Sequence, residues 1–133
     1  MILLDTQSLV WLDQDSAHIG PRSRALMDAA LQKDALAASA ISFWEVALLQ
    51  KAGRLQMSLS PVFWRSALLA NGLREIPLTG ELGTLAVALE DLHRDPADRF
   101  IIATALHHNA TLVTSDRKIL DWPGRLNRHD VRT

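Results

Sequence analysis

Four acidic residues occupy positions from which they can act together on a metal ion. Each one follows a predicted strand or lies in the first turn of a predicted helix: Asp5, Glu45, Asp98 and Asp116. Carboxylates held at about 4 Å from one another repel strongly and raise each other's pKa values. A divalent cation relieves that repulsion, and oxygen ligands without cysteine favour Mg2+, with Mn2+ as a substitute. Such an ion activates a bound water and neutralises charge on a phosphate under attack.

The elements that must position these acids alternate between strand and helix. Apolar or β-branched runs predict short strands at 2–4, 35–40, 73–78 and 110–114. Helical spacing predicts helices around 9–12, 22–31, 42–53, 61–70, 79–92 and 96–108, with a short turn after Asp116 and a weakly patterned polar tail from Gly124. This alternation predicts an α/β fold: a three-layer α/β/α sandwich around a central parallel sheet of four to five short strands. We found no repeat or linker, so residues 1–133 are expected to form one domain.

In open parallel sheets the binding crevice lies at the carboxyl ends of the strands. Asp5, Glu45 and Asp116 each follow a strand and therefore share that edge if the sheet is parallel. Asp98 joins them if its helix starts at the same edge. The sequence thus predicts that acids far apart in the chain converge in space.

Each acid also has a simpler interpretation as a helix cap. Ser42 and Glu45 have the spacing of a capping box, and Asp95-Pro96 is a strong helix start with Asp98 in its first turn. Asp5 and Asp116 fit the same role. If capping were their whole function, the chain would be a non-catalytic protein-interaction or regulatory module.

Composition limits the classes of partner. The chain has 133 residues, 48% of them hydrophobic, no cysteine, and a formal net charge of -1. It lacks the global positive excess of non-specific duplex binders, so a nucleic acid must be held locally. Arg94, Arg99 and Arg117 flank the late acids and are candidate phosphate contacts. The start of the chain lacks the basic residues and long apolar run of a signal peptide, so we expect a cytoplasmic protein without membrane contact.

Four segments carry a family resemblance. They read Ile2-Leu3-Leu4-Asp5-Thr6, Ser39-Ala40-Ile41-Ser42-Phe43-Trp44-Glu45, His93-Arg94-Asp95-Pro96-Ala97-Asp98-Arg99 and Thr111-Leu112-Val113-Thr114-Ser115-Asp116. In this order and at these separations the sequence resembles the PIN-domain family, and specifically the VapC-type toxins of prokaryotic toxin-antitoxin pairs. The resemblance extends over most of the chain.

The resemblance implies roles for particular residues. Asp5, Glu45 and Asp98 would form the acidic site, and Asp116 would be a more variable fourth acid. The metal ligands would be Asp5, Asp98 and Asp116, and the polar supporters would be Thr6, Thr114 and Ser115. Asp95 competes with Asp98 as a ligand, but it is better placed as the helix cap. The family usually carries histidine two places after the first aspartate, where this chain has Gln7.

The same resemblance implies an activity and partners. It implies a Mg2+-dependent endoribonuclease that cuts RNA to leave a 5'-phosphate and a 3'-hydroxyl, forms a homodimer, and is neutralised by an antitoxin protein. Apolar side chains at 43–49 and 57–64, including Trp44, Phe63 and Trp64, are candidates for these surfaces or for the core. We assign no chemistry to His93, His107 or His108, and we expect Trp11 to pack.

Other domains that gather acids at strand ends, one of signalling and one of phosphatase type, fit less well. A receiver-like domain needs paired acids and a late lysine, and a haloacid-dehalogenase-type phosphatase needs an aspartate where Gln7 stands. A related metal-dependent DNA nuclease uses similar chemistry and is separated mainly by its usual longer chain. It remains the enzymatic alternative.

Overall fold

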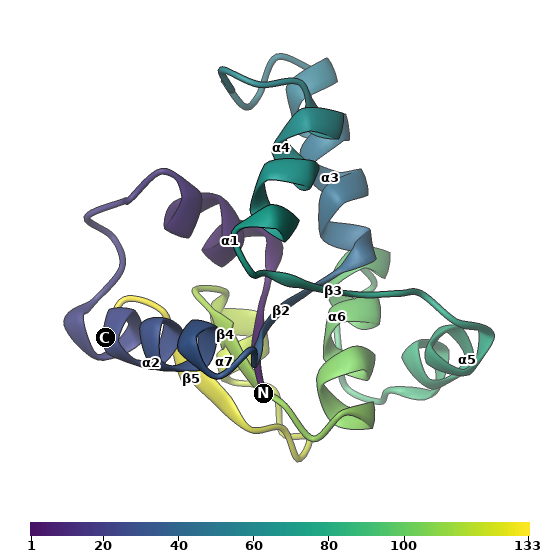
Figure 1. Cartoon of the computed structure of the whole chain (residues 1–133). Helices are drawn as coiled ribbons and strands as arrows, with labels where there is room; N and C mark the ends of the chain where they lie inside the picture. Colours follow the sequence, from purple (N-terminus) through teal and green to yellow (C-terminus); the bar gives the residue numbers. More distant parts are fainter.

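A five-stranded parallel sheet forms the centre of the protein in the computed structural model, which describes residues 1–133 (Figure 1). The strands are β1 (Ile2–Leu4), β2 (Leu36–Ser39), β3 (Arg74–Ile76), β4 (Thr111–Thr114) and β5 (Arg128–Asp130). They are ordered β3-β2-β1-β4-β5, and every neighbouring pair is parallel. The predicted parallel sheet is therefore confirmed, at the upper end of the expected number of strands.

Seven helices connect the strands: α1 (Thr6–Asp13), α2 (Pro21–Gln32), α3 (Ala40–Lys51), α4 (Pro61–Ala70), α5 (Gly80–Ala88), α6 (Pro96–His107) and α7 (Arg117–Leu120). Proline stands at the first position of α2, α4 and α6, where its missing N-H would have no helical partner. Ser60 and Asp95 cap α4 and α6 with their side chains. Local sequence thus fixes where these helices start.

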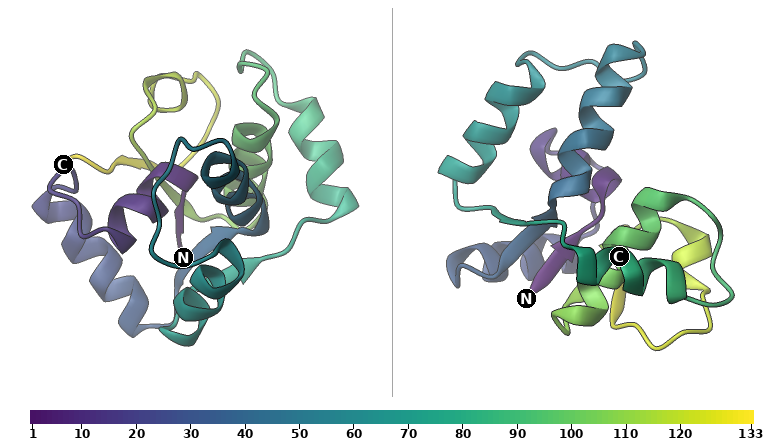
Figure 2. Two further views of the ribbon diagram at one scale, coloured as in Figure 1. Left: turned by 90° about the horizontal axis from the view of Figure 1, so that it is seen from above. Right: turned by 90° about the vertical axis from the view of Figure 1, so that its right-hand side faces the viewer.

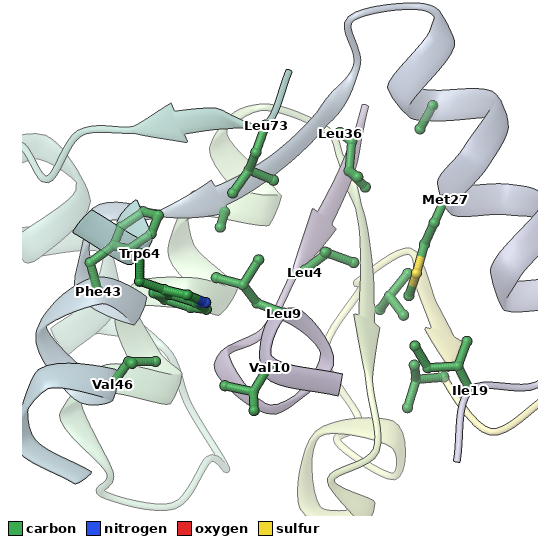
Figure 3. Packing of buried hydrophobic residues seen from close by; sticks show 14 residues of the cluster. Leu4, Leu9, Val10, Ile19, Met27, Leu36, Phe43, Val46, Trp64 and Leu73 are labelled. Atoms are coloured by element: carbon green, nitrogen blue, oxygen red, sulfur yellow. The ribbon is translucent and has the colours of Figure 1, made fainter. Parts of the chain in front are cut away.

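The sheet separates two hydrophobic clusters, because successive strand residues point to opposite faces. Leu4 belongs to the cluster beneath α1, α2, α3 and α4, which Figure 3 shows from close by. Leu3 belongs to the other cluster, which α6 covers with Ile101 and Ile102. This arrangement is the predicted three-layer sandwich.

Helices α3 and α4 pack against each other and extend beyond the sheet as a projecting pair (Figures 1 and 2). Phe43 and Trp64 join them in an edge-to-face contact with ring centroids 5.7 Å apart. Both rings are buried, so these two aromatic residues belong to the core. None of the helices combines the length and the apolar character that crossing a bilayer requires.

Two elements, β5 and α5, depart most from the sequence prediction. The polar tail contains β5, which pairs with β4 as an edge strand and whose residues are only partly buried. A strand of this kind has no alternating apolar pattern that could reveal it. The helix expected over 79–92 ends at Ala88, and Leu89 and Leu92 continue the apolar spacing because they pack on the second cluster from a loop.

Arg99 holds that loop in place. Its guanidinium donates hydrogen bonds of 2.7–3.1 Å to the carbonyl oxygens of Ala86, Leu89, Leu92 and His93. Arg99 was predicted to contact phosphate, but its N-H groups are bound to these backbone carbonyl oxygens. The planar fork of arginine suits several acceptors at once, which a lysine ammonium cannot match.

We predict that Arg99→Ala lowers the free energy of unfolding by about 3 kcal/mol, because it strips partly buried carbonyls of a charged donor. Arg99→Lys should recover little of that loss. Arg94→Ala is the matched control, because Arg94 is exposed and makes no ion pair. Urea unfolding measures all three variants, and equal stability of the Arg99 and Arg94 variants would contradict the role given to Arg99.

Candidate metal centre

The predicted acids meet where the order of the sheet reverses. The chain leaves β1 toward β2 on one side, while β4 lies on the other side of β1, so the β1–β4 boundary is a topological switch point. An open hollow of about 400 Å³ lies there. Its lining includes all four carboxylates: Asp5, Glu45, Asp98 and Asp116.

Asp5 is fixed on both of its carboxylate oxygens. It caps α1 by accepting a 2.8 Å hydrogen bond from the Ser8 backbone N-H at Oδ1. Thr114 donates to Oδ2 at 2.5 Å across the β1–β4 boundary. Asp5 is only 6% exposed, and this burial raises its pKa despite the two hydrogen bonds. The cap interpretation is correct for Asp5, but the cap also holds a buried carboxylate at the rim of the hollow.

Glu45 lies inside α3 and does not cap it. The helix begins at Ala40 and is capped by Ser39, so the capping box predicted for Ser42 and Glu45 is wrong. Glu45 instead accepts a short hydrogen bond from the Thr6 hydroxyl on α1. Burial raises the pKa of Glu45, and the nearby carboxylates of Asp98, Asp95 and Asp5 raise it further.

Asp98 pairs with a histidine to which we had assigned no chemistry. His93 Nε2 lies 2.7 Å from Asp98 Oδ2, and both side chains are about four-fifths buried. The Nδ1 atom of His93 is buried without a hydrogen-bond partner. Burial raises the pKa of Asp98, while the hydrogen bond from His93 opposes that shift. In the sequence, the signal for this contact is the position of His93 just before Asp95, the cap of α6.

Thr114 connects Asp116 to Asp5. Its hydroxyl donates to Asp5 and accepts a 3.0 Å hydrogen bond from the Asp116 backbone N-H. Asp116 caps the short α7 through Oδ1, at 2.9 Å from the Lys118 N-H, so its other oxygen has no protein partner. Ser115 lines the hollow beside it.

The donors present fit a hard divalent cation. Single ligand atoms of His93, Asp98 and Asp116 all lie within 4.8 Å of one another, and Asp5 borders the same hollow. Carboxylate oxygens are the ligands that Mg2+ and Mn2+ prefer. Asp95 does not line this hollow and caps α6 at 3.0 Å from the Ala97 N-H. Gln7 is exposed at the rim.

The three arginines predicted to contact phosphate differ in whether their guanidinium groups are free. Arg94 is exposed and unpaired, whereas Arg117 is bound to Asp121 at 2.9 Å. Arg99 does not reach the hollow, since it holds the loop before α6. The basic residue in the lining is Arg54, which is not among the arginines predicted from the sequence. It follows Gly53 at the end of α3, a position that carries no recognisable motif.

The parallel sheet with carboxylates converging at its switch point defines the class of the protein as an α/β domain with an acidic site at the edge of the sheet. Residues 2–123 match the model of the PIN domain, and the chain belongs to the PIN-domain family. It is 35% identical over 129 residues to "Ribonuclease VapC22" of Mycobacterium tuberculosis, covering 96% of this chain and 92% of that protein. The resemblance stated from the sequence is thereby confirmed.

Solved structures support the same fold. A toxin-antitoxin complex from Klebsiella pneumoniae matches with a TM-score of 0.62 at 23% identity, covering 98% of this chain and 97% of that one. VapBC2 from Rickettsia felis, solved with a DNA fragment from its promoter, matches with a TM-score of 0.68 at 19% identity. That match covers 98% of this chain and 100% of the other.

The raised pKa values of Asp5, Glu45 and Asp98 predict how pH acts on the metal-free protein. Ionising a carboxyl whose pKa is raised by folding favours the unfolded chain. These three carboxyls therefore stabilise the folded protein fully below about pH 4, where they are protonated in both states. This stabilisation is lost as the pH rises through their raised pKa values. Mg2+ or Mn2+ binds the ionised form, so metal should restore stability increasingly as the pH rises.

Urea unfolding at a series of pH values, in EDTA and in Mn2+, measures this effect. Asp98→Asn is the reference variant. Carboxylates outside the site also titrate, such as Glu75, whose pKa is lowered by hydrogen bonds from Arg65. They titrate in both proteins, so the comparison with the variant removes their contribution to stability. We expect the wild-type gain from Mn2+ to exceed that of the variant, and the difference to grow as the pH rises through the raised pKa values. Equal gains at every pH would refute the metal centre.

Proposed function

We propose that this protein is a Mg2+-dependent endoribonuclease and the toxic component of a type II toxin-antitoxin system. The observation that carries the proposal is the convergence of four carboxylates from β1, α3, α6 and the end of β4 on one hollow. The relative named a ribonuclease supports RNA as the substrate.

Asp5, Asp98 and Asp116 would hold the ion, with Mn2+ as a substitute for Mg2+. When bound, the ion supplies an activated water and neutralises charge on the phosphate. Ser8 and Thr114 orient Asp5 through their hydrogen bonds, and His93 orients Asp98. These contacts fix the carboxylates before the substrate arrives, so little reorganisation is needed on binding.

Glu45 is proposed as the proton-transferring group. Thr6 holds one carboxylate oxygen, and burial raises the pKa of the carboxyl, which makes the carboxylate a stronger base toward a proton. Water attacks phosphorus and gives up a proton to Glu45, and the bond from phosphorus to the 3'-oxygen breaks. The leaving oxygen takes a proton from solvent water and Glu45 returns its proton to solvent, so the products are a 5'-phosphate and a 3'-hydroxyl.

Exposed apolar residues near the start of α4 support a protein partner, as do the similar solved structures. Leu59, Val62 and Phe63 at the start of α4 are 44%, 73% and 67% exposed, which is unusual for large apolar residues close together. We propose that this region contributes to a homodimer or to contact with a cognate antitoxin protein in the cytoplasm. Similar folds solved as toxin-antitoxin complexes support that partner.

Cleavage of total RNA by the purified, partner-free protein tests the activity. We predict cleavage in Mg2+ and none in EDTA, with 5'-phosphate ends at the cut sites. Asp5→Asn and Asp98→Asn should each lower the rate by at least about a hundredfold, because each removes a proposed metal ligand. Asp28→Asn is the matched control, since Asp28 is exposed on α2.

A DNA substrate of matched sequence tests the alternative that the protein is a metal-dependent DNA nuclease. Cleavage of the DNA but not of the RNA would make the protein a DNA nuclease. If neither nucleic acid is cut and no metal stabilises the fold, the acids act only as caps and polar contacts, as expected of an interaction module.

A further inference from the structure

A second hollow adjoins the metal centre, and the metal centre does not explain it. It measures about 430 Å³ and lies between α3 and the start of α6. Its walls are mainly apolar, with Trp44, Leu48, Leu49 and Pro96 among the lining residues. Glu45, Leu49 and Arg54 line both hollows, so an extended ligand can pass from one to the other without leaving the surface.

Trp44 is exposed without a packing reason. It is 55% exposed, and Leu48 one helical turn later is 47% exposed. The other tryptophans are accounted for, because Trp64 and Trp122 are buried and Trp11 packs on the first cluster and stacks on His18. An indole left in water immediately before the proposed catalytic Glu45 indicates a contact made in the working complex.

Arg54 is a free cation between the two hollows. It is exposed and takes part in none of the ion pairs of the chain. Gly53, with φ +72, turns the backbone at the end of α3 and so places Arg54 outside the helix. No other basic residue lines either hollow. A guanidinium fits phosphate oxygens with paired hydrogen bonds.

We propose that Trp44 and Arg54 form a nucleotide subsite in which Arg54 binds an RNA phosphate next to the scissile one and Trp44 stacks on a neighbouring base. The inference rests on the proposed ribonuclease function. A nucleic acid is the favoured occupant because the free cation stands on the wall that the two hollows share, where a strand extending from the acidic hollow into the second one would pass. A base has an apolar face for the indole, and this stacking tolerates any sequence.

Fluorescence anisotropy with short labelled RNA of random sequence tests the subsite in Ca2+, which takes the same oxygen ligands as Mg2+. Trp44→Ala should weaken binding by roughly 5- to 150-fold, and Trp44→Phe should retain most of it. Arg54→Ala should lower the slope of log affinity against log salt by about 0.7, the value for one contact to a single strand. Arg54→Lys should keep that slope.

Two control variants remove an apolar side chain and an arginine elsewhere on the surface. Val87→Ala shortens an exposed apolar side chain on α5, and Arg22→Ala removes an exposed arginine from α2. Both should bind RNA as the wild type does. A labelled DNA of the same length shows whether the subsite needs the ribose hydroxyl. Thermal unfolding confirms that each variant is folded.

Cleavage in Mg2+ supplies a second readout. Trp44→Ala should raise KM with little change in kcat, because the indole contacts a nucleotide beside the reacting one. Wild-type affinity and KM in both the Trp44 and Arg54 alanine variants would overturn the subsite while leaving the ribonuclease intact. Normal RNA binding with loss of self-association in Trp44→Ala, measured by sedimentation, would assign the hollow to a protein partner and also overturn it.

If the wild type cuts no RNA, the proposed function fails, yet the binding measurement still decides the subsite. Loss of RNA affinity in both alanine variants would then support an RNA-binding role for the two residues. Absence of any RNA binding by the wild type would overturn the inference.

Discussion

The parallel pairing of β1 with β4 is the constraint on which the site depends. It sets Leu4 opposite Val113, so the first residue after β1 lies beside the last residue of β4. Asp5 and Thr114 are therefore neighbours although 109 positions separate them in the chain. The same strand exit carries Asp116, whose backbone N-H is bound to the Thr114 hydroxyl. Two buried strands thus fix the distance between two carboxylates before any ligand binds.

The energetic cost of this arrangement explains its polar surroundings. Burial disfavours the charged form of a carboxylate, and the nearby acids add repulsion. Hydroxyls and backbone N-H groups from Thr6, Ser8 and Thr114 compensate part of that cost. The raised pKa values of three of the acids indicate that the compensation is incomplete. In the proposed function a divalent ion supplies the missing positive charge, which ties the fold, the electrostatics and the proposed chemistry to one position.

Much of the fold could be predicted from local sequence. The apolar runs and the proline starts of α4 and α6 identified the first four strands and most helices, because burial and capping leave regular patterns. The fifth strand escaped because its partly buried residues Arg128, His129 and Asp130 are polar. The end of α5 was misplaced because Leu89 and Leu92 keep helical spacing while packing from a loop that Arg99 holds.

The acids of the candidate site were predictable, since strand ends in a parallel sheet share an edge, whereas their partners were not. The contact between Glu45 and Thr6 depends on how α3 lies against α1, and that between His93 and Asp98 depends on the loop before α6. Neither packing arrangement leaves a periodic trace in the sequence. Capping explained Asp5 and Asp116 correctly but incompletely, because each carboxylate caps a helix through one oxygen and also lines the hollow.

Locating the ion tests most directly whether these carboxylates share one cation. A crystal of the protein soaked in Mn2+ should give an anomalous peak in the hollow among Asp5, Asp98 and Asp116, within about 2.0–2.3 Å of carboxylate oxygens, near the distances expected for hard divalent ions. An occupied site elsewhere, or no peak at a Mn2+ concentration that supports cleavage, would contradict the claim that these carboxylates converge to share one cation.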